Sequence, residues 1–542
     1  MIERQRRLLR AVILWLIETG LSLLRSSAMR MAQQPTEQNE AITKLRTLTV
    51  AILQQALAQG HTCFPLDELA RLLCSRHKEF AENDVALALR QFGQQGDIAT
   101  RGDIVSLPHV ARAEEIIAHR LRHVGRRSRR INPRRLADWA SAESDQLNEE
   151  QRAALRVLTT SPIAILTGAP GTGKTVTIKA LSAILERAGY QVYLTAPTGR
   201  AAARLSEATG KPAQTLHRLL HNHRQQQPIR DLIIPPIKEA VIVDEASMLD
   251  LFLAERLVEF CTSRTRLIFV GDVYQLPPVG PGQVFRDLIE SGQIPVVELT
   301  TTLRQSDQSS ITVAARRIKV GVAPELPSPG AIKSDCYFIE VNSAFKIQRL
   351  VVAAATSSLP KRCGADPHQD IQVLTPMRKG PLGTIAINKL IRDSLNRCAA
   401  KANLSAQSSQ PDFLPNDRVL QTRNNYDLGV FNGECGIVEN ATSEIVAVRF
   451  GERCVEYPQT SFSELAHGFA ITIHRSQGSE YPFVIIPVHE SQSVMLAREL
   501  LYTALTRGRK MVVLIGSRRA FMQAINTTRI NRHTGLKNLL AP

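Results

Sequence analysis

The segment "GAPGTGKT" at residues 168–175 has the residue types that bind a polyphosphate. It matches G-x-x-x-x-G-K-[ST] in full, and it stands between an apolar run and a helix-forming run. Glycines let successive backbone N–H groups surround phosphate oxygens, and a helix start adds partial positive charge. Lys174 can then reach the β- and γ-phosphates of ATP, and the Thr175 hydroxyl can bind Mg²⁺. We therefore expect a nucleotide-binding loop made of Gly168, Ala169, Pro170, Gly171, Thr172, Gly173, Lys174 and Thr175.

An acidic pair follows the apolar run of "AVIVDEASMLD" (240–250). Asp244 can enter the coordination shell of Mg²⁺, and the adjacent Glu245 can orient or deprotonate an attacking water. Such a pair also occurs at the ends of surface strands. Its order after the phosphate-binding loop favours the metal site, so the two segments together predict ATP hydrolysis.

Three more polar side chains complete the predicted chemistry. The segment "LIFVGDVYQLPPV" (267–279) ends an apolar run with Asp272 and Gln275. Because neighbouring strand ends of a parallel sheet converge, we expect Gln275 to sense the γ-phosphate. Arg304 in "LTTTLRQ" and Arg507 in "YTALTRGRK" can neutralise charge that develops on the phosphate when a second domain closes over it. Either arginine alone would be an ordinary surface residue.

The elements that position these residues alternate between strand and helix. The pattern predicts an α/β domain with a mostly parallel sheet over 147–310. A second α/β domain is predicted over 311–404, and it resumes over 459–542. Between its two parts, 416–458 has short strands with turns at Asn432-Gly433 and Gly451, which predicts a small inserted β-barrel. The strands predicted for the first domain are 163–167, 191–196, 240–244, 266–270 and 295–299.

The region before the first α/β domain divides into three parts. Residues 45–125 have helical periodicity, and "DIATRGDIVSLP" then alternates as a hairpin, which predicts a winged-helix-like module. A helical domain that packs only on its neighbour is the alternative. Residues 126–146 form a basic linker, and the run 120–135 that leads into it contains eight arginines. Such a run is either a solvated linker or a contact to phosphates. For 1–44 we expect an amphipathic helix, or residues upstream of a start at Met29 or Met31.

Composition limits the class of protein and its partners. The chain has 542 residues, a formal net charge of +17 and a pI near 9.8, which favours a polyanion such as nucleic acid or an anionic membrane surface. Its eight cysteines form no CxxC pair, so neither a zinc site nor a disulfide framework is indicated, and a reducing cytoplasm is expected. The N-terminal apolar run is too short to span a bilayer, and we expect no membrane partner.

In order along the chain, these segments resemble the RecD-like family of superfamily 1 helicases. The resemblance covers about 45–540 and includes "LNEEQRAAL" (147–155), "TAPTGRAAARL" (195–205), "TLHRLL" (215–220), "TIHRSQGSEY" (472–481) and "LLYTALTRGR". It implies two RecA-like P-loop NTPase domains, an inserted SH3-like β-barrel and an N-terminal helical or winged-helix-like module. The implied activity is ATP-dependent DNA unwinding with 5′-to-3′ travel on single-stranded DNA, in recombination or repair.

The resemblance also implies roles for individual residues. Gln151 is expected to read the adenine and Glu480 to contribute to the nucleotide site. The expected contacts to the DNA strand are Thr198, His217, Asn432, Thr472 and His474. Two positions depart from the family pattern, Ala203 and Arg475, and each is expected to alter the grip on DNA. Only the short segment 221–240 is available for a strand-separating pin.

The motifs are compatible with several functions. The chain can be a motor that acts on single-stranded DNA and on junctions of single- and double-stranded DNA. It can be the motor subunit of a larger helicase–nuclease complex, or work with a single-strand-binding protein. It can also be an RNA helicase, a remodeller of nucleoprotein complexes, or a nucleotide-dependent clamp that does not travel.

Overall fold

The computed structural model describes residues 37–77, 80–125, 147–221, 238–301, 309–330, 332–400, 413–425, 427–528 and 532–541. The basic linker, most of the N-terminal extension, the segment 222–237 and Arg304 lie outside these ranges. The chain divides into two compact units. The first comprises the residues up to Glu115 together with Gly280–Gly282 and Arg532–Leu539, and the second comprises the remainder.

The first unit contains the predicted helices and hairpin. Its helices bury apolar stripes: Leu69 and Leu73 on one, Leu89 and Phe92 on another. A three-stranded antiparallel sheet, of order β1-β3-β2, accompanies them, and Gly102, with φ of 58°, forms the turn between its last two strands. The elements are α2 (Glu37–Ala58), β1 (Phe64–Pro65), α3 (Leu66–Arg76), α4 (Glu82–Gln95), β2 (Ala99–Arg101) and β3 (Ile104–Ser106), followed by α5 (Pro108–Leu121).

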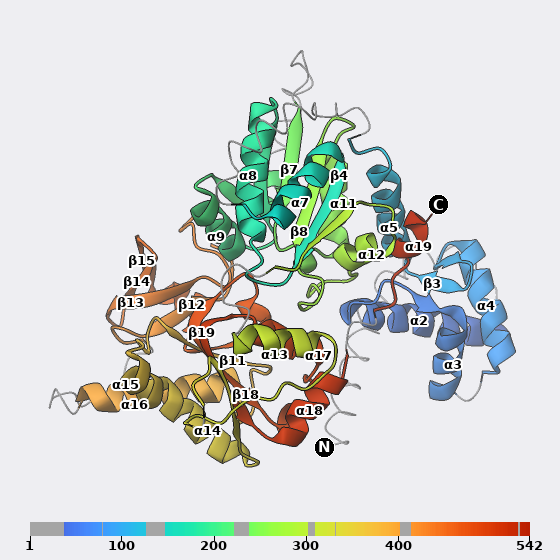
Figure 1. The fold of residues 1–542 in the computed structure, drawn as a ribbon. Helices are drawn as coiled ribbons and strands as arrows, with labels where there is room; N and C mark the ends of the chain where they lie inside the picture. Colours follow the sequence, from blue (N-terminus) through green and yellow to red (C-terminus); the bar gives the residue numbers. More distant parts are fainter. Residues whose placement is uncertain are drawn as a thin grey trace. The chain divides into compact units, whose positions relative to one another are not determined.

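The second unit begins with a parallel six-stranded sheet of order β6-β5-β7-β8-β4-β9, which we call the core of the first lobe (Figure 1). Every residue of β4, β7 and β8 is buried, as expected of central strands with helices on both faces. The strands are β4 (Ile163–Gly168), β5 (Gln191–Ala196), β6 (Ala213–Thr215), β7 (Glu239–Val243), β8 (Arg266–Gly271) and β9 (Val296–Leu299). The helices are α7 (Glu149–Thr160), α8 (Lys174–Arg187), α9 (Gly199–Thr209), α11 (Leu251–Phe260) and α12 (Val284–Glu290).

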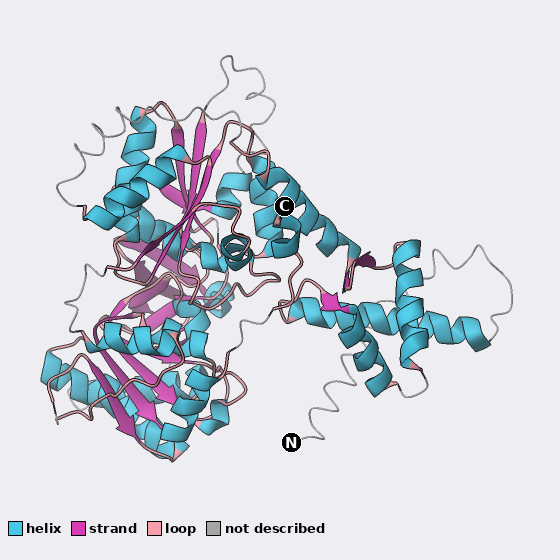
Figure 2. Ribbon diagram, turned by 45° about the vertical axis from the view of Figure 1, so that its right-hand side comes forward, coloured by secondary structure: helices cyan, strands magenta, loops and turns pink. Residues whose placement is uncertain are grey.

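A second parallel sheet, of order β10-β19-β18-β11-β17, forms the core of the second lobe. In Figure 2, the strands within each of these two sheets run side by side and are flanked by helices. The strands are β10 (Cys336–Glu340), β11 (Ile371–Thr375), β17 (Ala470–Thr472), β18 (Tyr481–Val488) and β19 (Gly508–Gly516). The main helices are α13 (Ser310–Lys319), α14 (Ala344–Ala353), α16 (Thr384–Ala400), α17 (Arg498–Leu505) and α18 (Arg518–Asn526).

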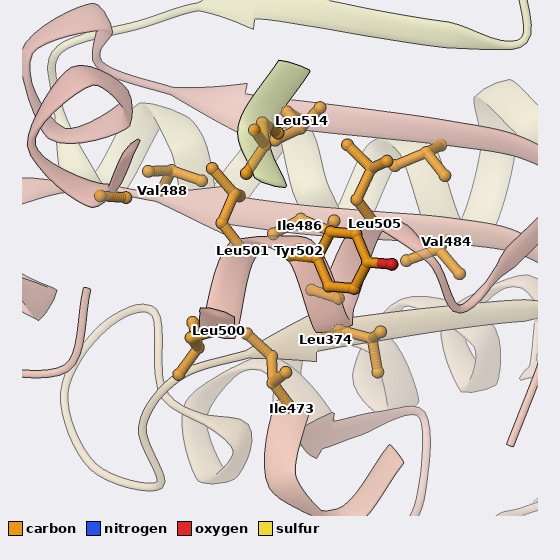
Figure 3. Packing of buried hydrophobic residues seen from close by; sticks show 14 of the residues in the cluster. Leu374, Ile473, Val484, Ile486, Val488, Leu500, Leu501, Tyr502, Leu505 and Leu514 are labelled. Carbon is orange, nitrogen blue, oxygen red and sulfur yellow. The ribbon is translucent and has the colours of Figure 1, made fainter. Parts of the chain in front are cut away.

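Successive residues of the central strands face opposite sides of this second sheet. On β18, Val484 and Ile486 pack with α17 and with Leu514 of β19 (Figure 3), whereas Phe483 and Ile485 pack with α14 and α16. The near-continuous apolar sequence of β18 therefore reflects burial on both faces. In the described part of the chain, none of the helices combines the length and apolar character required to cross a membrane.

The predicted inserted β region is an antiparallel five-stranded sheet of order β15-β14-β13-β12-β16. Its strands are β12 (Arg418–Gln421), β13 (Cys435–Ala441), β14 (Ile445–Phe450), β15 (Arg453–Pro458) and β16 (Leu465–His467). The last strand lies beyond residue 458 and pairs with the first, so the pairing within this sheet extends to His467. The fold class, two parallel α/β sheets with an inserted antiparallel sheet and an N-terminal helical module, is confirmed.

The packing of the second lobe predicts different costs for two leucine truncations. Leu514 is 0% exposed in the core, whereas Leu350 on α14 is 38% exposed. Leu514→Ala should lower the melting temperature by about 5–15 °C, because a buried cavity costs roughly 2–5 kcal/mol. Leu350→Ala, a matched control in the same lobe, should shift it by less than about 3 °C. Thermal unfolding followed by fluorescence measures both, and equal shifts would contradict this description of the core.

Candidate nucleotide-binding site

The phosphate-binding loop joins β4 to α8 at the carboxyl edge of the first sheet. Gly171 and Gly173 have φ values of 84° and 83°, a left-handed conformation that favours glycine, and α8 begins at Lys174. A Cβ on Gly168 would lie 2.7 Å from the carbonyl oxygen of Leu299, so only glycine fits there. The Lys174 Nζ donates to the carbonyl oxygens of Gly168 (2.8 Å) and Ala169 (3.0 Å). The loop thus has the backbone form that surrounds a phosphate, with the ammonium group beside it.

The acidic pair follows the neighbouring strand β7. Burial, reinforced by the charge of Glu245, raises the pKa of Asp244 to about 6, and the Lys174 ammonium opposes this shift. Glu245 has φ of 50°, which is strained for a residue other than glycine, and its N–H donates to Asp244 Oδ1 at 2.9 Å. A buried carboxylate next to a second acidic group is favoured by a bound cation. Asp244 and the hydroxyl of Thr175 are both oxygen donors, the type that Mg²⁺ prefers.

The next strand, β8, delivers Asp272 and Gln275. Asp272 is 1% exposed, and burial raises its pKa. Its carboxylate accepts from the Tyr274 N–H (3.0 Å), Gln275 Nε2 (3.4 Å) and the Tyr502 hydroxyl (2.9 Å). The Gln275 Oε1 is buried and has no hydrogen-bond partner among the described residues. Since β7, β8 and β4 are neighbours in the sheet, these groups lie beside the phosphate-binding loop.

A cleft of about 140 Å³ brings most of the predicted site residues together. The first lobe contributes the loop, Asp244 and Glu245, and the second lobe contributes Glu480 and Arg507. The Arg507 guanidinium is held by the carbonyl oxygens of Thr503 (3.1 Å) and Ser479 (3.2 Å). The predicted residues that line this cleft are Pro170, Gly171, Gly173, Lys174, Thr175, Asp244, Glu245, Gln275, Glu480 and Arg507.

Gln151 lies beneath the loop rather than in this cleft. Its side chain is fully buried, accepts from the Asn148 N–H (3.1 Å) to cap α7, and donates to the Thr172 carbonyl oxygen (3.3 Å). Through its hydrogen bond to Thr172, Gln151 supports the phosphate-binding loop although it precedes the loop by about twenty residues in the sequence. Its expected role in reading adenine stays a prediction, as does the role of Arg304, which lies outside the described residues.

Two residues that the sequence did not single out also belong to the site. Arg204 lines the cleft and forms an ion pair with Glu480 at 2.6 Å, which joins α9 of the first lobe to the second lobe. Tyr502 reaches Asp272 from the second lobe. Neither had a local signal: Arg204 is typical of an exposed helix face, and Tyr502 stands in an apolar helix.

The residues predicted to contact DNA come from several elements, and none of them lines the cleft. The Thr198 hydroxyl caps α9 by accepting from the Ala201 N–H at 3.2 Å. Thr472 and His474 lie where β17 passes into a short 3-10 helix (Ile473–Ser476). Asn432 is exposed, and its N–H donates to the Oδ1 of Asn424 at 2.9 Å. His217 is exposed, and its partial desolvation, followed by the charge of Arg256, lowers its pKa.

The start of α9 connects some of these elements. A Cβ on Gly199 would lie 2.7 Å from the Cβ of Phe431, the neighbour of Asn432 in the inserted sheet. Arg200 donates to the Tyr481 hydroxyl at 2.9 Å in the second lobe. The segments that carry Thr198 and Asn432 are therefore in direct contact. His217 is on neither of these two segments.

Three family models match the chain and agree with this geometry. They are an AAA domain over 146–331, an ATP-dependent RecD-like DNA helicase SH3 domain over 387–450, and a UvrD-like helicase C-terminal domain over 467–515. The RecBCD enzyme subunit RecD of Mycolicibacterium smegmatis is 32% identical over 445 residues, which are 73% of this chain and 75% of that protein. The chain belongs to the RecD-like family of ATP-dependent superfamily 1 DNA helicases.

A second RecD-like protein and a solved helicase structure are also similar. The ATP-dependent RecD2 DNA helicase of Deinococcus radiodurans is 35% identical over 448 residues, which are 81% of this chain and 59% of that protein. The chain thus spans about three fifths of that relative's length. The crystal structure of Bacteroides Pif1 bound to ssDNA overlaps 68% of this chain and 92% of Pif1, with 17% identity and a TM-score of 0.41, which is too distant to add to the family assignment.

The geometry of the loop predicts the result of removing its lysine. Lys174→Ala should reduce ATP hydrolysis by at least about a hundredfold, because charge on the phosphates loses its closest ammonium partner. Weak binding of single-stranded DNA should remain. Lys179→Ala, an exposed lysine on the same helix, is the matched control and should keep the wild-type rate. Phosphate release measures both variants, and normal turnover of Lys174→Ala would contradict the assignment of the loop.

Proposed function

We propose that the chain is an ATP-driven motor that travels 5′-to-3′ on single-stranded DNA and unwinds the duplex ahead of it. The observation that carries this proposal is the cleft between the lobes. One lobe supplies Lys174 and Asp244, and the other supplies Arg507 to the same cleft. A nucleotide bound there contacts both lobes, so its hydrolysis changes the contacts that hold them together. The 5′-to-3′ direction rests on the family resemblance.

The phosphates and the nucleoside have separate places beside the loop. A larger cavity of about 670 Å³ adjoins Ala169, Pro170 and Gly171 and extends to α13. It shares Pro170, Gly171 and Glu480 with the cleft that contains the catalytic residues. We place the base and ribose in the larger cavity and the β- and γ-phosphates beside Lys174.

Each catalytic residue has a role that its position supports. Asp244 and Thr175 would hold Mg²⁺, which when bound neutralises charge on the β- and γ-phosphate oxygens. Glu245 accepts a proton from the attacking water. The buried Gln275 Oε1, which has no hydrogen-bond partner among the described residues, accepts a hydrogen bond from the second hydrogen of that water. Arg507 approaches the γ-phosphate from the second lobe, as arginine fingers do. Its Nε and Nη1 donate to backbone oxygens and its Nη2 donates to the Thr506 hydroxyl, and a phosphate can replace these acceptors.

The DNA strand would be gripped by residues of both lobes in turn. Thr198 belongs to the first lobe, and Thr472 and His474 belong to the second. Asn432 lies in the turn between β12 and β13, and its neighbour Phe431 contacts the start of α9. When the lobes close and reopen, one set holds the strand while the other advances. The formal net charge of +17 favours such a polyanion. None of the seven cysteines in the described residues is in a disulfide, and we propose a cytoplasmic location.

A second candidate is the motor subunit of a larger helicase–nuclease complex. It is favoured by the 32% identity to a protein named as a subunit of the RecBCD enzyme, of which this chain covers 75%. In that case the chain supplies the movement and partner subunits supply the nuclease. A single-strand-binding protein is a further expected partner of either form, and recombination or repair is the expected setting.

Unwinding of tailed duplexes tests the proposal. The purified chain should displace a strand from a DNA duplex with a 5′ single-stranded tail at least about ten times faster than from one with a matched 3′ tail, and only with ATP. Blunt duplex and Lys174→Ala are the controls. A preference for the 3′ tail would refute the direction. Phosphate release without strand displacement would favour the motor subunit of a complex, and faster displacement with an RNA tail would favour an RNA helicase.

A further inference from the structure

A buried hydrogen bond connects the two lobes beside the cleft. The Tyr502 hydroxyl of α17 donates to Asp272 Oδ2 at 2.9 Å, and both residues are 1% exposed. The Tyr502 ring packs among apolar side chains of the second lobe, including Leu374 and Ile486 (Figure 3). Asp272 follows β8 of the first lobe. The buried phenol of Tyr502 in one lobe is therefore hydrogen-bonded to the buried carboxylate of Asp272 in the other.

The Asp272 carboxylate also determines how Gln275 is oriented. Its Oδ2 accepts from both Tyr502 and Gln275 Nε2, and its Oδ1 accepts from the Tyr274 N–H. The Asp272 oxygens act as acceptors in all three contacts, and the amide nitrogen of Gln275, which is a donor, faces the carboxylate. The amide oxygen then faces the other way. That oxygen is buried without a partner among the described residues, and Gln275 lines the nucleotide cleft.

The arginine of the cleft lies two residues after the end of the same helix. The Thr503 hydroxyl accepts from the Leu276 N–H at 3.0 Å, and the Thr503 carbonyl oxygen accepts from Arg507 Nε at 3.1 Å. From the opposite direction, Gln477 Nε2 donates to the Leu276 carbonyl oxygen at 3.1 Å. The end of α17 therefore contacts the segment of Gln275 through the side chains of Tyr502 and Thr503. Its backbone, at the Thr503 carbonyl oxygen, also binds Arg507.

We propose that Tyr502 is a positioning residue for ATP hydrolysis. Its hydroxyl fixes the Asp272 carboxylate, which turns the amide oxygen of Gln275 toward the attacking water while Arg507 is in reach of the same cleft. Because Gln275 and Arg507 are attached to different lobes, the hydroxyl makes the correct orientation of one depend on the position of the other. The inference rests on the proposed function, because it concerns the same hydrolytic reaction.

A purely structural role makes a different prediction, and the chain supplies a matched comparison. Tyr457 of the inserted sheet is also fully buried, and its hydroxyl donates to Gln421 Oε1 at 2.9 Å. Tyr457→Phe and Tyr502→Phe each remove one buried phenol hydrogen bond and retain the ring. Both should lower the melting temperature by a similar few degrees. Only the second change should alter catalysis.

The test is a steady-state comparison of ATP hydrolysis at saturating single-stranded DNA. Tyr502→Phe should lower kcat by about tenfold or more, with the KM for ATP within about twofold of wild type. Tyr457→Phe should leave both unchanged. In a Gln275→Ala background, which already lacks the amide, adding Tyr502→Phe should change kcat by less than about twofold.

Three results are decisive. A wild-type kcat in Tyr502→Phe, with a melting temperature lowered as in Tyr457→Phe, would overturn the inference and leave a structural contact. Independent, multiplicative losses from Tyr502→Phe and Gln275→Ala would also overturn it, because the tyrosine would then act by another route. Absence of ATP hydrolysis by the wild-type chain would instead refute the proposed function, so the two failures are distinguished.

Discussion

The site depends on the adjacency of three parallel strands. β7, β8 and β4 are neighbours in the first sheet, and adjacent strands lie only about 4.8 Å apart. Their carboxyl ends therefore place the phosphate-binding loop, Asp244 and Asp272 next to one another. Two of these groups are buried carboxylates with raised pKa values, because burial disfavours their charge. The fold thus places two carboxyl groups beside Lys174, so that a metal ion can bind the carboxylates while the ammonium group and the loop N–H groups bind the phosphates.

The second lobe completes this edge through side chains that reach the same groups. Arg204 pairs with Glu480 across the cleft, Tyr502 binds Asp272, and Arg507 lines the cleft wall. Of these residues, Arg204, Glu480 and Arg507 also line the cleft in which we place the phosphates. In the proposed function, a change in the phosphates alters the contacts that hold the lobes together, and the inserted region, which contacts the start of α9, would move with them. This arrangement explains how hydrolysis can be converted into movement along a strand.

The sequence predicted the parts of the structure that depend on local pattern. The central strands, the phosphate-binding loop and the acidic pair have short-range signals, since buried parallel strands are continuous apolar runs and the loop needs glycine at fixed positions. Residues defined by packing between lobes had no such signal. Tyr502 is typical of an apolar helix and Arg204 of an exposed one. The strand Leu465–His467 is short and exists only because β12 pairs with it, so it fell outside the predicted barrel.

Coupling between hydrolysis in the cleft and travel along single-stranded DNA is the property on which the proposed function depends. The most direct test measures the rate of phosphate release as a function of the length of a single-stranded oligonucleotide at saturating ATP. A motor spends longer moving on a longer strand before it dissociates, so the rate should rise with length to a plateau at least about tenfold above the DNA-free rate. A rate that oligonucleotides of every length leave unchanged would contradict the coupling.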